Sequence, residues 1–277
     1  MRWPEKHFVA SEQFQFLYIP IEKVACSALK SWVIELAEGQ GAANCVDSNA
    51  HIRSRYELQA QPAEVQRRWL HDKRLFRFAF VRNPWDRLVS GFLNKFVPWK
   101  SPAQKFAEEH ARRLRWSRAI NWMSAGWLCS SGKASSQRWR EELTFRQFVA
   151  ELRQRNPCRF DLHWRPQHLF LGTQPLDFLG RFENLEDDFR TLCQKLNFSG
   201  NLPEANKTRR DAAVLRNLAD APLSELRSLA GFPGYSWFYT PDLAEQVAEL
   251  YTEDIRRFGY DLASGQRELA GESERLP

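Results

Sequence analysis

The chain has little cysteine and no familiar metal-binding motif. Its 277 residues include five cysteines, an odd number with no CxxC pair: Cys26, Cys45, Cys129, Cys158 and Cys193. This pattern argues against a disulfide framework and against a zinc site of the usual spacing. The sequence also lacks an HExxH motif and an acidic metal cluster. We therefore expect a protein that works without a metal ion.

Long apolar runs are also missing. No window approaches the roughly 20 apolar residues of a membrane span, and the N-terminal MRWPEKHFVASEQ has no apolar core of signal-peptide length. We therefore expect a cytoplasmic protein. The GxxxxGK[ST] pattern is absent as well, which disfavours an ordinary nucleoside-triphosphate loop and counts against a nucleotide kinase.

Two segments carry the strongest positive pattern. Residues 16–32 read FLYIPIEKVACSALKSW, and residues 76–96 read FRFAFVRNPWDRLVSGFLNKF. Each begins with aromatic and β-branched residues, passes through a short loop and continues at helical spacing, which predicts a strand, a loop and a helix. Free N–H groups at such a helix N-terminus favour a phosphate. Because each loop also holds a cation, each is a candidate anion site.

The two loops differ in their chemistry. In the first, Lys23 precedes small residues that let a ligand approach the backbone closely, and one of them adds a hydroxyl: Ala25, Cys26, Ser27 and Ala28. In the second, Arg82 follows the strand directly and Pro84 suits the first helical turn. Ser90 lies about two helical turns beyond Arg82.

Together the segments resemble the 5′-phosphosulfate-binding and 3′-phosphate-binding motifs of sulfotransferases, most closely those of the carbohydrate sulfotransferase families. The first family motif reads roughly P-K-[small]2-[ST]; Lys23 and Ser27 match it, whereas Glu22 stands where proline is usual. The second reads roughly V-R-[DNH]-P-[aromatic]-x-R-L-x-S, and residues 81–90 match every fixed position.

The resemblance implies a donor and several roles. The donor is 3′-phosphoadenosine 5′-phosphosulfate (PAPS), with its phosphosulfate in the Lys23 loop and its 3′-phosphate on Arg82 and Ser90. Lys23 would offset the charge that develops on the leaving bridge oxygen. Arg87 is expected to serve the helix or its packing.

Later segments extend the resemblance. Residues 177–198 and 247–261 look like later elements of the family, and residues 202–210 resemble a loop that closes over the nucleotide. Thr208 and Arg209 are therefore candidate phosphate contacts, with a solvated basic turn as the alternative. Eukaryotic relatives are usually anchored in the Golgi, so we expect a soluble bacterial relative.

We predict an α/β fold with a central, mainly parallel sheet flanked by helices, in a P-loop-like nucleotide-binding topology. Both motif loops should lie beyond the carboxyl ends of parallel strands. One domain is expected over residues 1–263, with a basic, tryptophan-rich helical insert at about 98–140 and a polar tail at 264–277. A strand is expected near 14–20, and helices near 27–38, 62–71 and 144–155.

The base that removes the acceptor proton is sought among six histidines. In sulfotransferases with a histidine base, it often lies between the first-loop lysine and the 3′-phosphate arginine, which here leaves His51 and His71. His71 is placed at a helix end, so we favour His51; an exposed loop histidine is the alternative. The rival is His163, with Gln167 as its companion, whereas His168 is expected to be structural.

The predicted function is transfer of a sulfuryl group from PAPS to a hydroxyl, with a carbohydrate as the expected acceptor. A formal charge of +6 suits an anionic donor, although it also accompanies nucleic-acid binding. Tryptophans and arginines in the insert could stack on sugars or on bases, or simply pack in the core. A nucleic-acid-binding protein is thus the alternative, although no stable nucleic-acid partner is expected for the leading function.

Overall fold

The computed structural model describes residues 5–39, 56–97, 142–171, 175–198, 202, 214–229 and 231–260. Three predicted site residues lie outside these ranges: His51, Thr208 and Arg209. The insert expected at 98–140 and the tail expected at 264–277 lie outside them too. The single domain over residues 1–263 and the P-loop-like topology therefore stay predictions.

Among the described residues, the sheet has four strands in chain order: β1 (Val9–Ser11), β2 (Phe16–Ile19), β3 (Phe76–Val81) and β4 (Phe178–Arg181). β1 is antiparallel to β2, whereas β2, β3 and β4 are parallel. β3 is buried along nearly its whole length, as an almost uninterrupted apolar run requires. The predicted α/β fold with a mainly parallel sheet is confirmed. β1 was not predicted, because its short run gives no clear alternation.

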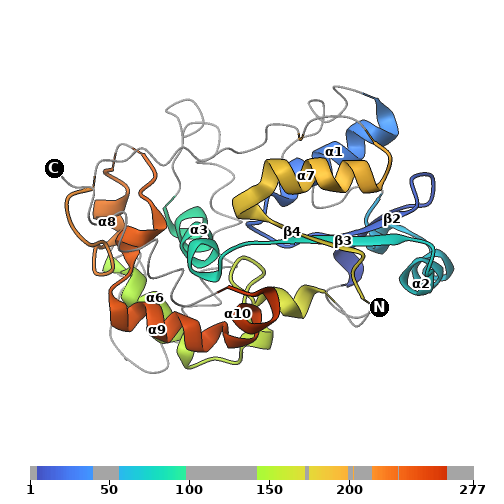
Figure 1. Ribbon diagram of the computed structural model, residues 1–277. Coiled ribbons are helices and arrows are strands. Elements are labelled where there is room, and N and C mark those ends of the chain that lie inside the picture. The colour runs from blue at the N-terminus through green and yellow to red at the C-terminus, as the bar shows by residue number, and fades with distance from the viewer. Residues whose placement is uncertain are drawn as a thin grey trace, which may run out of the picture.

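Two helices lie side by side on one face of this sheet, α1 (Cys26–Glu38) and α7 (Leu185–Lys195) (Figure 1). Trp32 of α1 meets Phe189 of α7 edge to face, with ring centroids 5.3 Å apart. Trp32 also stacks on Phe16 of β2 at 5.8 Å. Aromatic burial therefore fixes α1, and with it the loop that precedes it, to the sheet.

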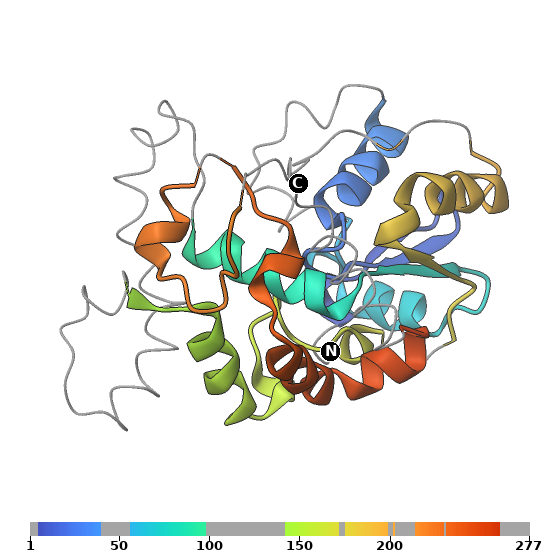
Figure 2. The same cartoon turned by 60° about the vertical axis from the view of Figure 1, so that its left-hand side comes forward.

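A second apolar core lies beside the sheet, around the helix that continues from β3 (Figure 2). Phe92 and Phe148 pack there with ring centroids 5.2 Å apart, and the Trp85 indole donates to the Ala244 carbonyl at 2.9 Å. Ile255 packs against both cores. The helices of this region are α3 (Pro84–Phe96), α6 (Phe145–Arg153), α8 (Leu223–Leu226), α9 (Pro241–Leu250) and α10 (Thr252–Phe258).

The other helices are short or lie at the opposite edge. α2 (Ala63–His71) leads into the amino end of β3. Short 3₁₀ helices cover Glu5–His7, Leu58–Ala60, Pro157–Arg159, Gln167–Phe170, Phe182–Asn184 and Tyr235–Phe238. The expected helices at 27–38, 62–71 and 144–155 thus agree with α1, α2 and α6 to within two residues.

No helix in the described part of the chain has the length and apolar character that crossing a bilayer requires. Cys26, Cys158 and Cys193, the cysteines that fall within the described ranges, are free thiols.

Candidate active site

The first loop has an unusual backbone. Lys23 and Ala25 adopt positive φ angles of 68° and 50°, a region that residues with a Cβ seldom occupy. The fully buried Val24 anchors the loop between them. Ala25 is the N-cap of α1, where no side chain caps the helix and no acidic residue lies in the first turn. The N-terminus of α1 is therefore electrostatically suited to an anion.

Lys23 itself is half-buried, and its surroundings weaken its hold on the proton. Burial lowers the pKa of Lys23 to about 8, with Arg82 and Lys95 acting in the same direction and Cys26 and Glu22 opposing them. Lys23 therefore remains mostly protonated at pH 7. A bound anion beside it would stabilise that charged form.

The second segment builds its own helix start. The Asn83 side chain accepts hydrogen bonds from the N–H groups of Trp85 at 3.0 Å and Asp86 at 3.3 Å. Pro84 occupies the first turn, where its missing N–H has no cost. These local signals fix the start of α3 at Pro84, two residues after Arg82.

Arg82 connects the two segments. The residue is 5% exposed, and its guanidinium pairs with Asp86 at 2.9 Å. Its Nη1 donates to the Lys23 carbonyl at 2.8 Å and to the Ser90 hydroxyl at 3.3 Å. The structure thus brings together three residues that the sequence assigned to the donor: Lys23, Arg82 and Ser90. They meet beyond the carboxyl ends of the parallel strands β2 and β3, at the predicted edge.

Arg87 makes a second connection. Its side chain is buried, and it donates to the carbonyls of Glu22 at 2.9 Å, Leu162 at 2.9 Å and Arg165 at 2.7 Å. These contacts agree with the expectation that Arg87 serves the helix or its packing. One guanidinium ties the first loop and the segment around His163 to the same helix.

His163 lies against α3. A Cβ built on Gly91 would stand 2.8 Å from the His163 carbonyl oxygen, so only glycine allows this approach. The Nδ1 of His163 is 2.6 Å from Oδ1 of Asp161. Burial lowers the pKa of His163, and Lys95 adds to that effect, whereas Asp161 and Glu22 oppose it. His163 therefore belongs to the same group of charged side chains as the first loop. This charged cluster consists of Glu22, Lys23, Arg82, Asp86, Lys95, Asp161 and His163.

Glu22, which stands at the usual proline position, also belongs to this cluster. Burial raises its pKa, but the protonated form of His163, the charges of Lys30 and Lys23, and a hydrogen bond from Cys26 together outweigh burial and lower it. The Cys26 thiol donates to Glu22 at 3.3 Å. Burial, with Glu22 nearby, raises the pKa of Cys26 to about 12, so this thiol is protonated and poorly nucleophilic.

Gln167, the predicted companion of His163, and the nearby His168 both have other partners. Gln167 is fully buried, accepts from the Arg82 N–H at 2.9 Å and donates to the Arg82 carbonyl at 2.8 Å. It therefore positions Arg82 rather than accompanying His163. His168 contacts Asp254 at 2.6 Å, which joins it to α10 and agrees with the expected structural role. His71 ends α2, at the edge of the sheet opposite Lys23.

Sequence reasoning missed three charged members of the cluster. Asp86 had a usable signal, because it stands four residues after Arg82 on a predicted helix. Asp161 had a weaker one, two residues before His163. Lys95, near the end of α3, had none, because only the packing of residues 161–165 on α3 makes it a neighbour of His163.

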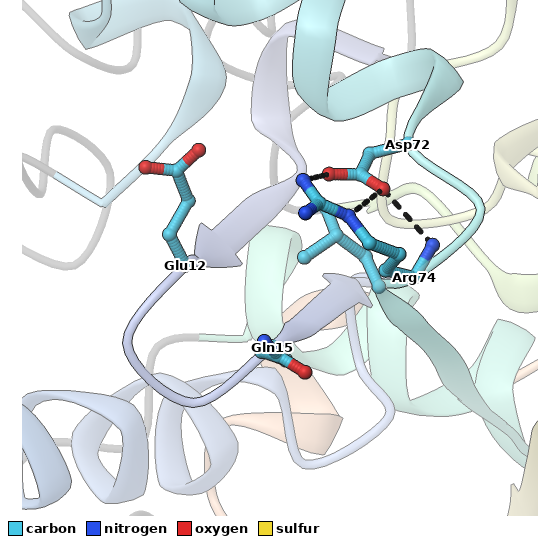
Figure 3. Close-up of a pocket in the computed structure, with 5 residues that line it drawn as sticks. Glu12, Gln15, Asp72 and Arg74 are labelled. Carbon is cyan, nitrogen blue, oxygen red and sulfur yellow. Dashed lines mark hydrogen bonds and ion pairs between the residues drawn. The ribbon is translucent and has the colours of Figure 1, made fainter.

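A pocket of about 200 Å³ lies elsewhere, lined by Glu12, Gln15, Asp72, Arg74 and Leu75 (Figure 3). Gln15 and Leu75 precede β2 and β3, so this pocket is at the amino edge of the sheet, opposite the two motif loops. Arg74 is already paired with Asp72 there at 2.7 Å. Among the described residues, no three histidine, cysteine or acidic side chains gather as metal ligands.

Known proteins that resemble this chain are sulfotransferases. The model of the sulfotransferase family matches residues 6–261. Carbohydrate sulfotransferase 14 of Homo sapiens is 32% identical over 198 residues, which cover 68% of this chain and 46% of that protein. Carbohydrate sulfotransferase 11 of Mus musculus is 26% identical over 215 residues, covering 71% and 54%.

Carbohydrate sulfotransferase 8 of Mus musculus is 24% identical over 241 residues, covering 82% of this chain and 53% of that protein. The chain thus spans about half the length of the curated relatives it matches. No solved structure matches it significantly.

Proposed function

Because this chain belongs to the sulfotransferase family, we propose that it moves the sulfuryl group of PAPS to a hydroxyl of a carbohydrate by in-line transfer. The observation that carries the proposal is the contact between the two motifs. Arg82 donates to both the Lys23 carbonyl and the Ser90 hydroxyl, so the two anion-binding segments form one site. A donor with a phosphate at one end and a phosphosulfate at the other fits such a site, and a P-loop-like binding arrangement is part of the proposal.

Different residues hold the two charged ends of the donor. The phosphosulfate is taken by the first loop, which offers the Lys23 ammonium, the Ser27 hydroxyl and the uncapped N-terminus of α1. The backbone of Ala25, Cys26 and Ala28 lines the same turn. The 3′-phosphate is taken by Arg82 and Ser90, and Thr208 and Arg209 are further proposed contacts.

The Ser90 hydroxyl explains how Arg82 can accept a phosphate although it already has partners. At 3.3 Å this contact is longer than those of Arg82 with Asp86 and with the Lys23 carbonyl. A phosphate oxygen can replace the hydroxyl as the acceptor, and the hydroxyl can then donate to the same phosphate. Because the other two contacts persist, Arg82 still supports the Lys23 loop when the nucleotide binds.

Lys23 supplies the electrostatic part of the reaction. As the bond between sulfur and the bridge oxygen breaks, negative charge develops on the leaving nucleotide, and a preorganised cation stabilises it. In-line positioning supplies the rest, as in other group transfers of this kind. The proton of the acceptor hydroxyl goes to a histidine, for which His51 and His163 are the candidates.

The test is to incubate the protein with PAPS and a panel of carbohydrate acceptors while following release of adenosine 3′,5′-bisphosphate. Release that depends on both an acceptor and Lys23 is expected. Strong, salt-sensitive binding of single-stranded nucleic acid without any turnover of PAPS would favour the nucleic-acid-binding alternative instead.

A further inference from the structure

The pair formed by His163 and Asp161 fixes which nitrogen of the imidazole carries hydrogen. Oδ1 of Asp161 is 2.6 Å from Nδ1 of His163 and also accepts the His163 backbone N–H at 3.0 Å. Burial raises the pKa of Asp161, but its hydrogen bond and charge interaction with His163 outweigh burial and hold the pKa well below its usual range. An ionised carboxylate only accepts hydrogen bonds. The hydrogen of neutral His163 therefore lies on Nδ1, and Nε2 keeps its lone pair.

The pair lies within the charged cluster of the first loop. Glu22 and Lys95 both act on the titration of Lys23 and on that of His163, so the two side chains share neighbours. The His163 carbonyl rests on Gly91, the residue after Ser90. Arg87 holds the Glu22 carbonyl and the Leu162 carbonyl with one guanidinium. His163 is thereby fixed relative to the residues assigned to both ends of the donor.

We propose that His163 accepts the acceptor proton at Nε2, and that Asp161 is the positioning residue that keeps the other proton on Nδ1. The inference rests on the proposed function. In the step, the acceptor oxygen forms a bond to sulfur while its proton passes to Nε2. The bond between sulfur and the bridge oxygen breaks, and its electron pair leaves with adenosine 3′,5′-bisphosphate. The imidazolium then releases its proton to water.

The charges facing His163 suit this role at neutral pH. Burial is the largest influence and lowers the pKa of His163, and Lys95 on α3 lowers it further; Asp161 on its own loop and Glu22 on the first loop raise it. The net shift is downward, so His163 is neutral at pH 7 and ready to accept a proton. Glu22 is the less basic neighbour, because its own pKa is lowered from a value that is already acidic.

The chain contains a matched control for this pair. His168 and Asp254 have the same local geometry, with Nδ1 and Oδ1 2.6 Å apart and the His168 N–H donating to Asp254 at 2.8 Å. Asp254 is fully buried and also accepts the Gln167 N–H at 2.6 Å, so this pair joins α10 to the chain segment before β4. A contact between a carboxylate and a histidine therefore does not by itself indicate a catalytic base. The two pairs differ in their surroundings, because His163 lies near Glu22 and Lys95, whereas Asp254 binds the Gln167 N–H.

The kinetic test uses Asp161→Asn, Lys95→Gln and His168→Gln, with pH profiles of kcat and kcat/KM. An amide can donate to Nδ1 and force the hydrogen onto Nε2, so Asp161→Asn should lower kcat by about 10- to 100-fold with little change in PAPS affinity. The acidic limb of the pH profile of Asp161→Asn should move to lower pH, because the imidazolium of His163 loses its carboxylate partner and its pKa falls. Lys95→Gln should move the same limb to higher pH, and His168→Gln should leave it in place.

Wild-type turnover separates the two proposals. If the wild type sulfates no acceptor, the proposed function fails; if it does and the acidic limb of Asp161→Asn is unmoved with kcat intact, only the present inference fails. His163→Gln with wild-type kcat, beside an inactive His51→Gln, would assign the base to His51. Imidazole ¹⁵N NMR reads the tautomer without any turnover: hydrogen on Nδ1 of His163 supports the inference, and hydrogen on Nε2 overturns it.

Discussion

The two halves of the site reach their shapes in different ways. α3 is started by its own residues, since Asn83 caps it and Pro84 occupies its first turn. The first loop has no such support, because Lys23 and Ala25 hold positive φ angles and α1 has no side-chain cap. A loop of that kind persists only where surrounding structure holds it.

That support comes from the second segment. Arg82 holds the Lys23 carbonyl, and Arg87 holds the carbonyl of Glu22, the residue before it. The segment that begins α3 thus also holds the backbone of the Lys23 loop in place. The two motifs are therefore structurally coupled, because a change at the start of α3 reaches Lys23 through hydrogen bonds to the backbone.

The largest effect is expected for Arg87→Ala. It leaves three partly buried carbonyls without their donor, and each such loss costs on the order of 1 kcal/mol or more, in addition to the lost packing of the buried Arg87 side chain. The free energy of unfolding, measured with urea, should fall by several kcal/mol. Asn83→Ala, which removes only the cap of α3, should cost about 1 kcal/mol.

If the free energy of unfolding of Arg87→Ala is no lower than that of Asn83→Ala, the first loop keeps its conformation without the hydrogen bonds from Arg87. If the alanine variant does not fold, Arg87→Lys provides the same comparison, because it keeps the charge but lacks the planar fork that reaches several carbonyls at once.

A smaller effect of opposite sign is expected for Lys23→Met. The folded state lowers the pKa of Lys23 to about 8, so holding the ammonium costs stability below that pH, and the cost disappears above the unfolded pKa of about 10.4. Lys23→Met should therefore raise the free energy of unfolding by about 1–3 kcal/mol at pH 7 and by much less at pH 10.5. An equal gain at both pH values would mean that packing, not charge, is responsible.

The smallest effect separates the loop from the helix that follows it. Ala25 has a positive φ, so Ala25→Gly relieves strain and should stabilise the protein by up to about 1 kcal/mol. Ala28 lies inside α1, where Ala28→Gly should destabilise by about 0.5–1 kcal/mol. Thermal unfolding of the two variants should move in opposite directions. Equal losses would remove the claim that the loop is strained.

The difference between the locally determined start of α3 and the first loop, which distant residues hold, also decides what could be predicted from the sequence. Arg82, Asp86 and Ser90 follow helical spacing after a strand, so their shared face was readable. The position of both motif loops beyond the carboxyl ends of the strands could also be predicted, because ligand-binding loops of parallel sheets lie at that edge. The positive φ of Lys23 was not readable, because nothing local favours it. The contacts of Arg87 were not readable either, because they join residues 65 to 78 positions apart and exist only in the packed fold.

The most direct measurement is calorimetric titration of adenosine 3′,5′-bisphosphate into the wild type, Arg82→Ala and Lys23→Ala, paired with turnover of PAPS. Arg82→Ala should weaken binding at least about tenfold, since charge-assisted hydrogen bonds are worth roughly 1.5–3 kcal/mol. Lys23→Ala should bind the product nearly normally while its turnover falls on the order of 100-fold or more. Unchanged affinity in a folded Arg82→Ala, or equal losses of binding and turnover in Lys23→Ala, would contradict the division of the donor between the two motifs.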